Sequence, residues 1–379
     1  MKEELGIPEG AAGVLPNQYL EKAVSLGVID AGKYRVPPEN IQPASIDLRL
    51  GEVAYRIRCS FLPDSQPVSA KMKDLIVDEL DLRRDGAVLE TNRPYLVPLI
   101  EKVSLPPTIR GKANPKSSTG RVDVFTRVIT DNSFRFDEIN AGYHGELYLE
   151  IVPLSFTVRV KEGLALNQLR LSTGPSRLTD AQILSAHEQD PIVFRDGEPV
   201  HKIDTARGLF LGLDLKGDDA GRVGHRAKDN APLLPLAGNE PLNPDDYWDP
   251  VRREPGDRIV LAPERFYLLL SQEEVRISPA YASEMTAFDP TSGELRTHYA
   301  GFFDPGFGFD PAGQFHGSRA ALEVRAHDVP FMIEHGQRVC KLTFERMLET
   351  PTRLYGREIG SSYQNQRDTL GKHFRPGLK

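Results

Sequence analysis

The sequence predicts an all-β dominated protein with a few short helices, organised as two tandem copies of one β-domain. Short apolar stretches with β-branched residues recur along the chain and are separated by glycine and proline, as expected for short strands. The clearest are residues 44–51, 146–160, 265–271 and 338–347. At 379 residues, of which 39% are hydrophobic, the chain is long enough for two domains with separate cores.

Helical patterns are few. Near the N-terminus, the segment 17–29 has apolar residues at helical spacing, and Asn17 is expected to cap its first turn. A second helix is predicted over 178–188, directly after a Gly-Pro pair. Neither is long enough to change the β-dominated prediction.

The second half of the chain repeats the first at a shift of about 173 positions. Glutamate, glycine and leucine keep the same spacing in both halves, at Glu150, Gly163 and Leu169 and again at Glu323, Gly336 and Leu342. Two further stretches resemble each other at nearly the same shift, 101–107 with 273–279 and 47–51 with 213–217. A tandem duplication of one β-domain accounts for all three similarities.

The duplication sets the expected domain limits. We expect a first repeat at 1–175 and a second at 190–350, followed by a closing tail at 351–379. Residues 217–256 are rich in Asp, Gly and Pro, which indicates a long excursion inside the second repeat.

Charge and hydropathy exclude several classes of protein. The net charge of −7 argues against a general nucleic-acid binder, which needs a basic face for phosphate contacts. No window approaches the roughly 18 consecutive apolar residues of a membrane span. The N-terminal residues MKEELGIPEG lack the apolar core of a signal peptide. We therefore expect a cytoplasmic protein whose anionic ligands meet a local cluster of Arg and Lys.

Cysteine and histidine patterns predict no protein-held metal. Cys59 and Cys340 are the only cysteines and have no partner at metal-ligand spacing, so we expect both to be small core residues. Nine histidines are present, but no H-E-x-x-H or H-x-H pattern occurs.

The run 116–121, KSSTGR, combines two cationic side chains, three hydroxyls and a glycine. Such a loop can hold an oligophosphate through charge-assisted bonds, hydroxyl donors and backbone N–H groups. Its glycine spacing is not that of a Walker loop. A solvated turn with a hydroxyl cap is the alternative interpretation.

The run 298–308, HYAGFFDPGFG, is an apolar, hairpin-like stretch interrupted by Asp-Pro-Gly. It can present backbone groups to the edge of a base, with an aromatic ring packed below. Taken alone, it fits an ordinary aromatic-rich β-turn better.

Glu150 and Glu323 lie at equivalent places of the two repeats, each between apolar residues of a predicted strand. Desolvation near a core raises the pKa of a glutamate towards the range useful for proton transfer. The alternative is that each faces solvent on the polar side of its strand. The duplication keeps the glutamate while most of its neighbours differ, which favours a functional role.

The C-terminal run 355–374 is polar and contains glycine, yet it keeps aromatic and carboxamide side chains close together. These are Tyr355, Tyr363, Asn365 and Gln366. Carboxamides both donate and accept hydrogen bonds, so this tail can read the edge of a nucleobase when it folds over a pocket.

These motifs together resemble the dCTP deaminase family of the dUTPase-like β-barrel (β-clip) superfamily. The stretches that carry the resemblance are QPASIDLRLG at 42–51, KSSTGR, the Gly-aromatic hairpin leading into a Leu-Glu strand, and Y-x-N-Q at 363–366. The resemblance covers nearly the whole chain and is nearest to the long, tandem-repeat bacterial members. Tyr355 also lies eight residues before Tyr363, as in the short members.

The resemblance implies roles for the residues that match the family's motifs. Phosphates are held by the R/K-S-S-x-x-R loop, which maps onto Lys116, Ser117, Ser118 and Arg121. Base recognition maps onto Tyr299, Ala300, Asp304 and Gln366, with Tyr355, Tyr363 and Asn365 in the closing tail. The family's catalytic glutamate follows the base-binding hairpin and activates a water that attacks C4 of cytosine, without zinc. The signature of zinc deaminases is indeed missing from the sequence.

The two repeats depart from the family pattern in opposite ways. Repeat 1 has the phosphate loop but carries Asn140 to Tyr143 in place of Asp-Pro-Gly-aromatic. Repeat 2 has that hairpin but reads FDPTSGELR where the phosphate loop belongs. We therefore expect one composite site per chain, with Glu323 as the general base and Glu150 as the alternative. In the tail, Ser362 stands where the family usually has lysine.

Three functions follow from the resemblance. The first is a dCTP deaminase that forms dUTP and ammonia, with Mg²⁺ carried on the triphosphate and no zinc. The second is a dUTP or dCTP pyrophosphatase, alone or as a bifunctional deaminase. The third is an inactive nucleotide-binding sensor. We expect a small-molecule nucleotide as the partner, with no nucleic acid and no membrane, and a homo-oligomeric assembly.

Overall fold

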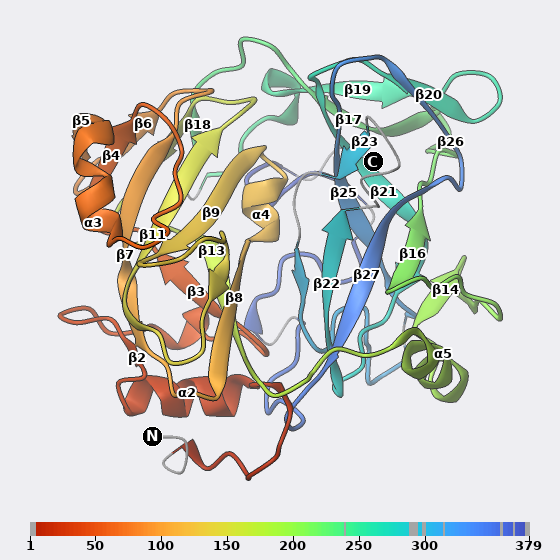
Figure 1. Ribbon diagram of the computed structural model, residues 1–379. Coiled ribbons are helices and arrows are strands. Elements are labelled where there is room, and N and C mark those ends of the chain that lie inside the picture. Colours follow the sequence, from red (N-terminus) through yellow and green to blue (C-terminus); the bar gives the residue numbers. More distant parts are fainter. Residues whose placement is uncertain are drawn as a thin grey trace. The chain divides into compact units, whose positions relative to one another are not determined.

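The computed structural model describes residues 5–238, 240–287, 295–297, 301–313, 315–356, 359–366 and 368–375. The chain divides into two compact units whose strands can be followed in Figure 1. Unit 1 comprises residues 1–176, 232–239 and 347–353, and unit 2 comprises residues 177–231, 240–346 and 354–379. Two short pieces thus depart from the expected order of repeat, repeat and tail, because 232–239 and 347–353 both belong to unit 1.

Unit 1 consists mainly of strands. The strands are β1 (Gly13–Val14), β2 (Ile29–Asp30), β3 (Ile46–Arg49), β4 (Val53–Ile57), β5 (Ile76–Asp81), β6 (Ala87–Leu89), β7 (Tyr95–Ser104), β8 (Ile109–Pro115), β9 (Val124–Thr130), β10 (Glu138–Ile139), β11 (His144–Pro153), β12 (Val158–Val160), β13 (Ala165–Thr173) and β18 (Leu234–Pro235). One sheet has the order β1-β13-β8-β10 with β3 also on β13, and a second has the order β5-β4-β7-β11-β9 with β2 on β7. The third sheet, β18-β12-β6, explains why residues 232–239 belong to this unit.

Unit 2 is built in the same way. Its strands are β14 (Val193–Arg195), β15 (Glu198–Pro199), β16 (Leu209–Gly212), β17 (Arg222–Ala227), β19 (Trp248–Arg252), β20 (Arg258–Leu261), β21 (Phe266–Val275), β22 (Tyr281–Ala287), β23 (Leu295–Thr297), β24 (Phe302–Phe303), β25 (Ser318–Ala326), β26 (Phe331–Glu334) and β27 (Arg338–Arg346). The largest sheet has the order β15-β14-β21-β17-β19, with β25 on β21 and β23 on β25. The other two sheets are β16-β27-β22-β24 and β20-β26.

The strand pairings of unit 1 recur one by one in unit 2, which confirms the duplication. Antiparallel pairs β7–β11, β8–β13 and β3–β13 have their counterparts in β21–β25, β22–β27 and β16–β27. Pairs β4–β7, β6–β12, β8–β10 and β9–β11 likewise correspond to β17–β21, β20–β26, β22–β24 and β23–β25.

In both units a buried glutamate carboxylate accepts a backbone N–H from the last residue of an equivalent strand, β3 or β16. Glu101 on β7 accepts the backbone N–H of Arg49 at 2.7 Å, and Glu273 on β21 accepts that of Gly212 at 2.8 Å. Burial raises the pKa of the Glu101 carboxyl although Arg49 Nε lies 2.6 Å away. In unit 2 the cation comes from Arg195 on β14, at 2.9 Å. The duplicated domain has therefore kept the carboxylate and changed its partner.

One sequence match is corrected by these pairings. Residues 46–49 of β3 correspond to residues 209–212 of β16, so the match of 47–51 with 213–217 is displaced by three residues. Both alignments place leucines at alternating positions, so the pattern alone does not distinguish them. The backbone decides, because the N–H groups of Leu50 and Leu213 bond to equivalent loop carbonyls.

The helices are short. They are α2 (Asn17–Ser25), α3 (Val68–Lys71) and α4 (Ser117–Gly120) in unit 1 and α5 (Asp180–Gln189) in unit 2, with 3₁₀ turns η1 (Pro38–Asn40), η2 (Lys73–Leu75) and η3 (Pro244–Asp246). The predicted helix 178–188 is confirmed, and Thr179 forms a capping box with Gln182. Among the described helices, none is long and apolar enough to cross a membrane.

Asn17 does not cap α2 as expected. Pro16 occupies the N-cap position, and Asn17 is the first residue of the helix. Its buried carboxamide instead donates to Thr352 Oγ1 at 2.7 Å and accepts the Thr352 N–H at 3.0 Å. Tyr19 on the same helix bonds to Glu349 at 2.7 Å, so α2 ties residues 347–353 to unit 1.

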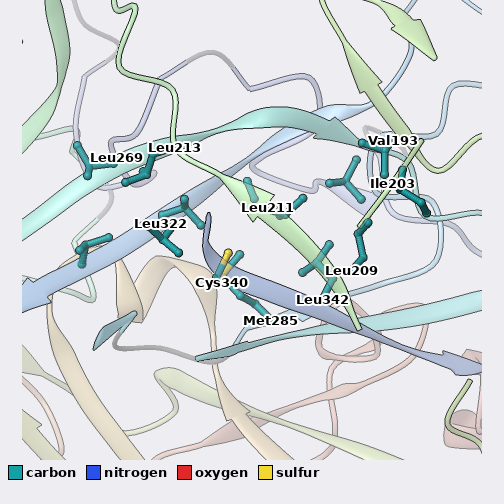
Figure 2. Close-up of a cluster of buried hydrophobic side chains, with 14 of the residues drawn as sticks. Val193, Ile203, Leu209, Leu211, Leu213, Leu269, Met285, Leu322, Cys340 and Leu342 are labelled. Atoms are coloured by element: carbon teal, nitrogen blue, oxygen red, sulfur yellow. The ribbon is translucent and has the colours of Figure 1, made fainter. Parts of the chain in front are cut away.

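The core of unit 2 is a continuous cluster of aliphatic side chains drawn from β16, β21, β25 and β27 (Figure 2). Cys340 is fully buried among them, beside Leu211 and Met285, as predicted for a core cysteine. Cys59 is exposed, so the same prediction is wrong for this residue. It follows β4 in a segment that leaves the sheet, where the apolar pattern of the strand has ended.

Candidate functional site

The loop 116–121 follows β8 directly and forms the single turn of α4. Lys116 forms an ion pair with Asp47 of β3, and Arg121 Nε donates to Ser117 Oγ at 3.2 Å. Arg121 is buried, with 2% of its surface exposed, while Lys116 and Ser117 are half-buried. The two cationic side chains of the loop, Lys116 and Arg121, are therefore already bonded to neighbouring side chains.

The other two hydroxyl side chains of this loop, Ser118 and Thr119, are both buried. Thr119 Oγ1 donates to the Leu166 carbonyl at 2.8 Å, which ties the loop to β13. Thr119 is thus a structural residue, whereas Lys116, Ser117 and Arg121 carry the charge and the hydroxyl predicted for phosphate binding.

Glu150 lies in the middle of β11 with 1% of its surface exposed, so it does not face solvent. Arg127 is directly opposite on β9, and its Nη2 lies 2.9 Å from Glu150 Oε1. Ser60 Oγ donates to the other oxygen, Oε2, at 2.7 Å. The guanidinium of Arg127 is stacked 3.7 Å from the ring centroid of Phe136. Both carboxylate oxygens therefore accept from neighbouring side chains.

Glu323 occupies the equivalent place on β25 and is also buried, with 6% of its surface exposed. Directly opposite is Leu268 on β21, and opposite Leu268 is His225 on β17. Residues opposite each other in neighbouring strands point to the same face of the sheet. Glu323 and His225 thus share the face that points away from the aliphatic core, about 10 Å apart across two strand spacings.

The hairpin 301–309 precedes β25 and contains the Asp-Pro-Gly turn. Asp304 is buried, and its carbonyl accepts the N–H of Phe307 at 3.1 Å. The ring of Phe307 packs edge-on against Phe303 at a centroid distance of 4.9 Å. Asp304 thus lies in a tight turn whose flanking residues Phe303 and Phe307 form an aromatic pair.

Unit 1 has the same turn with different chemistry. The carbonyl of Asn140 accepts the N–H of Tyr143 at 3.1 Å, as Asp304 does for Phe307. Asn140 therefore occupies the place of Asp304 in the duplicated domain, and the acidic group of this turn is present in unit 2 alone.

The tail folds onto unit 2. The Tyr355 N–H bonds to the carbonyl of Pro305 at 2.8 Å, and the Tyr355 ring lies 5.6 Å from that of Phe307. Asn365 N–H donates to Ser318 Oγ at 2.6 Å, and Gln366 Nε2 donates to the carbonyl of Arg319 at 2.5 Å. The predicted tail residues are thus placed between the hairpin and the start of β25.

Two cavities lie under the tail within unit 2. One, of about 580 Å³, is lined by Tyr363 and Gln366 together with His225 and Leu270. The other, of about 780 Å³, is lined by Asn365 and Gln366 and by the start of β25. Three of the tail residues singled out in the sequence therefore line hollows of a size that suits a nucleotide.

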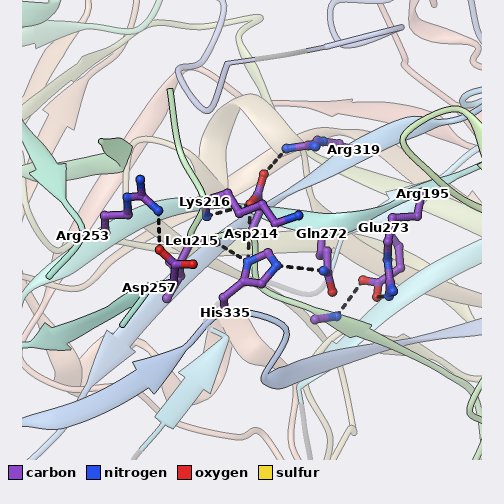
Figure 3. Close-up of polar contacts among 11 residues, drawn as sticks. Arg195, Asp214, Leu215, Lys216, Arg253, Asp257, Gln272, Glu273, Arg319 and His335 are labelled. Carbon is purple, nitrogen blue, oxygen red and sulfur yellow. Dashed lines mark hydrogen bonds and ion pairs between the residues drawn. The ribbon is translucent and has the colours of Figure 1, made fainter. Parts of the chain in front are cut away.

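A polar network supports the wall that both cavities share (Figure 3). Arg319 lines both cavities and forms an ion pair with Asp214. Asp214 Oδ1 lies 3.6 Å from His335 Nδ1, which also accepts the Leu215 N–H at 3.1 Å. His335 Nε2 lies 2.9 Å from the carboxamide of Gln272. The guanidinium of Arg319 is fixed in orientation by this network.

The predicted site residues thus fall into separate groups. Lys116, Ser117, Ser118, Arg121 and Glu150 belong to unit 1, whereas Asp304, Glu323 and the tail belong to unit 2. Tyr299 and Ala300 lie outside the described residues. The composite site therefore stays a prediction.

Sequence reasoning missed several residues of these sites. Arg127 and Ser60 hold Glu150, and Gln364 contacts the hairpin. Only Gln364 lay inside a stretch that the sequence had singled out, because it is the variable position of Y-x-N-Q. The other two depend on strand register and on a loop crossing a sheet, which no local pattern specifies.

The architecture is that of a duplicated β-domain whose C-terminal tail belongs to the second copy. Family models of the 2′-deoxycytidine 5′-triphosphate deaminase match residues 11–175 with the N-terminal domain and residues 179–374 with the C-terminal domain. The chain belongs to the dCTP deaminase family.

The chain is also similar to solved and curated members. It resembles the crystal structure of 2′-deoxycytidine 5′-triphosphate deaminase from Agrobacterium tumefaciens, with a TM-score of 0.85 and 43% identity, over 92% of this chain and 100% of that one. It is 31% identical over 156 residues to "dCTP deaminase, dUMP-forming" from Parafrankia sp., covering 38% of this chain and 72% of that protein. It is 26% identical over 133 residues to dCTP deaminase from Halorubrum lacusprofundi, covering 35% of this chain and 63% of that protein.

Proposed function

We propose that this protein is a dCTP deaminase, which hydrolyses dCTP to dUTP and ammonia. The observation that carries the proposal is the complementary survival of motifs within one family member. Unit 1 keeps the phosphate loop and has lost the acid of its turn at Asn140, whereas unit 2 keeps Asp304 followed by Glu323. Division of labour between the two copies accounts for this pattern better than decay to an inactive sensor.

Glu323 is the proposed general base. It takes a proton from a water whose oxygen attacks C4 of the cytosine ring, giving a tetrahedral carbon that bears both hydroxyl and amino groups. Glu323 then returns this proton to the amino nitrogen, the C4–N bond breaks and ammonia leaves. The proton of the C4 hydroxyl group moves to N3 as the C4 carbonyl of uracil forms. Glu323 is buried on the face of β25 that points away from the aliphatic core. This burial favours the role, because a desolvated carboxylate holds a proton more readily.

Lys116, Ser117, Ser118 and Arg121 are the proposed phosphate ligands. The substrate is dCTP with Mg²⁺ on its phosphates, so the loop supplies the remaining positive charge and hydroxyl donors. In this proposal Lys116 exchanges its partner Asp47 for a phosphate oxygen, while Arg121 stays bonded to Ser117.

Base recognition is assigned to Asp304 and Gln366, with Tyr299 and Ala300 of the same hairpin. The tail closes over the nucleotide through Tyr355, Tyr363 and Asn365. Support comes from the cavities, since Tyr363, Asn365 and Gln366 each line one.

A product assay on the purified protein tests the proposal. Incubation with Mg²⁺ and dCTP should release ammonia and dUTP in equal amounts, measured by glutamate dehydrogenase coupling and by anion-exchange chromatography. Pyrophosphate release from dCTP without ammonia would favour the pyrophosphatase alternative. Binding of dCTP without any product would favour the sensor.

A bifunctional enzyme is the second candidate, because relatives such as the Parafrankia protein are dUMP-forming. The same assay separates the two, since a bifunctional enzyme yields dUMP and pyrophosphate along with ammonia. We also propose that the protein is cytoplasmic and forms a homo-oligomer. Light scattering on the purified chain measures its oligomeric state directly.

A further inference from the structure

Gln364 makes three hydrogen bonds to the backbone of one turn. Its Nε2 donates to the carbonyls of Gly306 at 3.1 Å and Phe309 at 3.0 Å. Its Oε1 accepts the N–H of Gly308 at 2.9 Å. Both N–H donors and the oxygen of one tail side chain are thus bonded to the hairpin that carries Asp304.

The chemistry fixes the orientation of this carboxamide. Turning the amide over would place its oxygen against two carbonyl oxygens and its NH₂ group against an N–H. A glutamine meets this arrangement of two acceptors and one donor, whereas a glutamate, having no donor when ionised, does not. The position therefore selects glutamine over its isosteric acid.

The turn that Gln364 holds has an unusual backbone. Gly306 and Gly308 have φ of 98° and 66°, in the region that favours glycine. A Cβ on Gly308 would lie 2.0 Å from the carbonyl of Val275 and one on Gly306 2.8 Å from the Tyr355 nitrogen, so both glycines are required by close packing. Two flexible glycines within four residues of Asp304 need an external support to define one conformation.

We propose that Gln364 is a positioning residue, which couples closure of the tail to the geometry of the base-binding hairpin. When the tail is docked, Gln364 sets the turn that places Asp304 and leads into the strand of Glu323. When the tail leaves, the turn loses three bonds at once. This inference rests on the proposed deaminase function for its kinetic consequence, but its structural part does not.

Gln364→Glu tests the proposal, with Gln189→Glu as the matched control. Gln189 is an exposed glutamine at the end of α5, so its change adds the same charge to unit 2 away from the hairpin. We expect Gln364→Glu to lower kcat/KM for dCTP by at least about tenfold. The substitution removes both N–H donors, and a carboxylate oxygen in their place repels the carbonyls of Gly306 and Phe309. Competitive inhibition by inorganic triphosphate, which probes the phosphate loop alone, should be unchanged.

Two further readouts separate positioning from general structural damage. A protonated carboxylic acid regains one O–H donor, so the activity of Gln364→Glu relative to wild type should recover as the pH falls towards 5. Hydrogen exchange at the amides of Gly308 and Tyr355 should accelerate in Gln364→Glu and in Gln364→Ala, while the melting temperature stays near that of Gln189→Glu.

Wild-type turnover and wild-type exchange at Gly308 in Gln364→Glu would overturn the proposal. So would a loss of activity that follows the melting temperature without recovery at low pH. An inactive wild-type protein would instead contradict the deaminase function, and the exchange measurement would still decide the role of Gln364.

Discussion

Glu150 and Arg127 face each other across β11 and β9, with 2.9 Å between carboxylate oxygen and guanidinium nitrogen. Ser60 completes the bonding of the carboxylate from the other side. This pairing gives Glu150 a structural task at the strand position that the duplication repeats in Glu323. We propose Glu323 as the general base.

The first prediction concerns these two glutamates. Glu323→Gln should lower kcat by a factor of about 10² to 10⁴, the usual effect of removing a general acid or base. Glu150→Gln should keep turnover within about tenfold of wild type and lower the free energy of unfolding by roughly 1–3 kcal/mol, because a charge-assisted bond is lost. Steady-state kinetics and chemical denaturation of both variants measure this. Near-normal turnover in Glu323→Gln together with an inactive Glu150→Gln would reverse the assignment.

Arg121 should act on the phosphates. Arg121→Ala should raise KM for dCTP and leave a poor discrimination between dCTP and deoxycytidine, which is measured as the ratio of their kcat/KM values. Because Arg121 is buried, Ser117→Ala is the companion variant, which removes a partner of the guanidinium without opening a large cavity. Unchanged discrimination in both variants would exclude the phosphate role.

Removal of the tail should stop turnover. A chain ending at Gly360 loses Gln364 and Gln366 but keeps Tyr355, which packs on Phe307 and on the core of unit 2. We expect no measurable deamination and a cooperative melting transition in calorimetry. An active enzyme lacking residues 361–379 would show that the tail is dispensable.

Acid should release the end of the tail. Burial, with a smaller contribution from the charge of Lys372, lowers the pKa of His373 from its ordinary value of 6.5 to about 4. A lowered folded-state pKa stabilises docking above pH 6.5, and this contribution is lost progressively as the pH falls towards 4. At pH 5 the loss is about 2 kcal/mol.

Trp248, the only tryptophan of the chain, reports this release because it packs 5.8 Å from Phe374. Its emission should shift to the red as the pH falls, and His373→Gln should flatten the shift. His225, whose pKa burial also lowers, adds a contribution of the same sign. An identical pH profile in wild type and His373→Gln would assign the effect to other groups.

Metal dependence should follow the substrate. EDTA should abolish turnover and excess Mg²⁺ should restore it, because the ion accompanies the triphosphate. A zinc-selective chelator such as 1,10-phenanthroline should have no effect in the presence of Mg²⁺. Inactivation by phenanthroline, reversed by zinc, would contradict the glutamate mechanism.

Much of the fold was predictable because it is encoded locally and twice. Apolar stretches identified the long strands β11, β21 and β27, and the fixed spacing of Glu150, Gly163 and Leu169 with Glu323, Gly336 and Leu342 revealed the duplication. The errors lie where one local sequence pattern is compatible with more than one structure. Residues 47–51 match two alignments equally well, and Asn17 has the chemistry of a cap but bonds to a segment 335 residues away.

The sequence by itself determined the family, the two-unit plan, the candidate phosphate loop and the pair of candidate glutamates, because these depend on residue types at short, fixed spacings. Tertiary structure decided how Glu150 is paired, since its partner Arg127 depends on the register of β9 and β11. It also decided that Gln364 connects the tail to the hairpin, whereas Gln366 bonds to β25. Strand register and tail docking are set by backbone bonds between distant segments, and no short stretch of sequence encodes them.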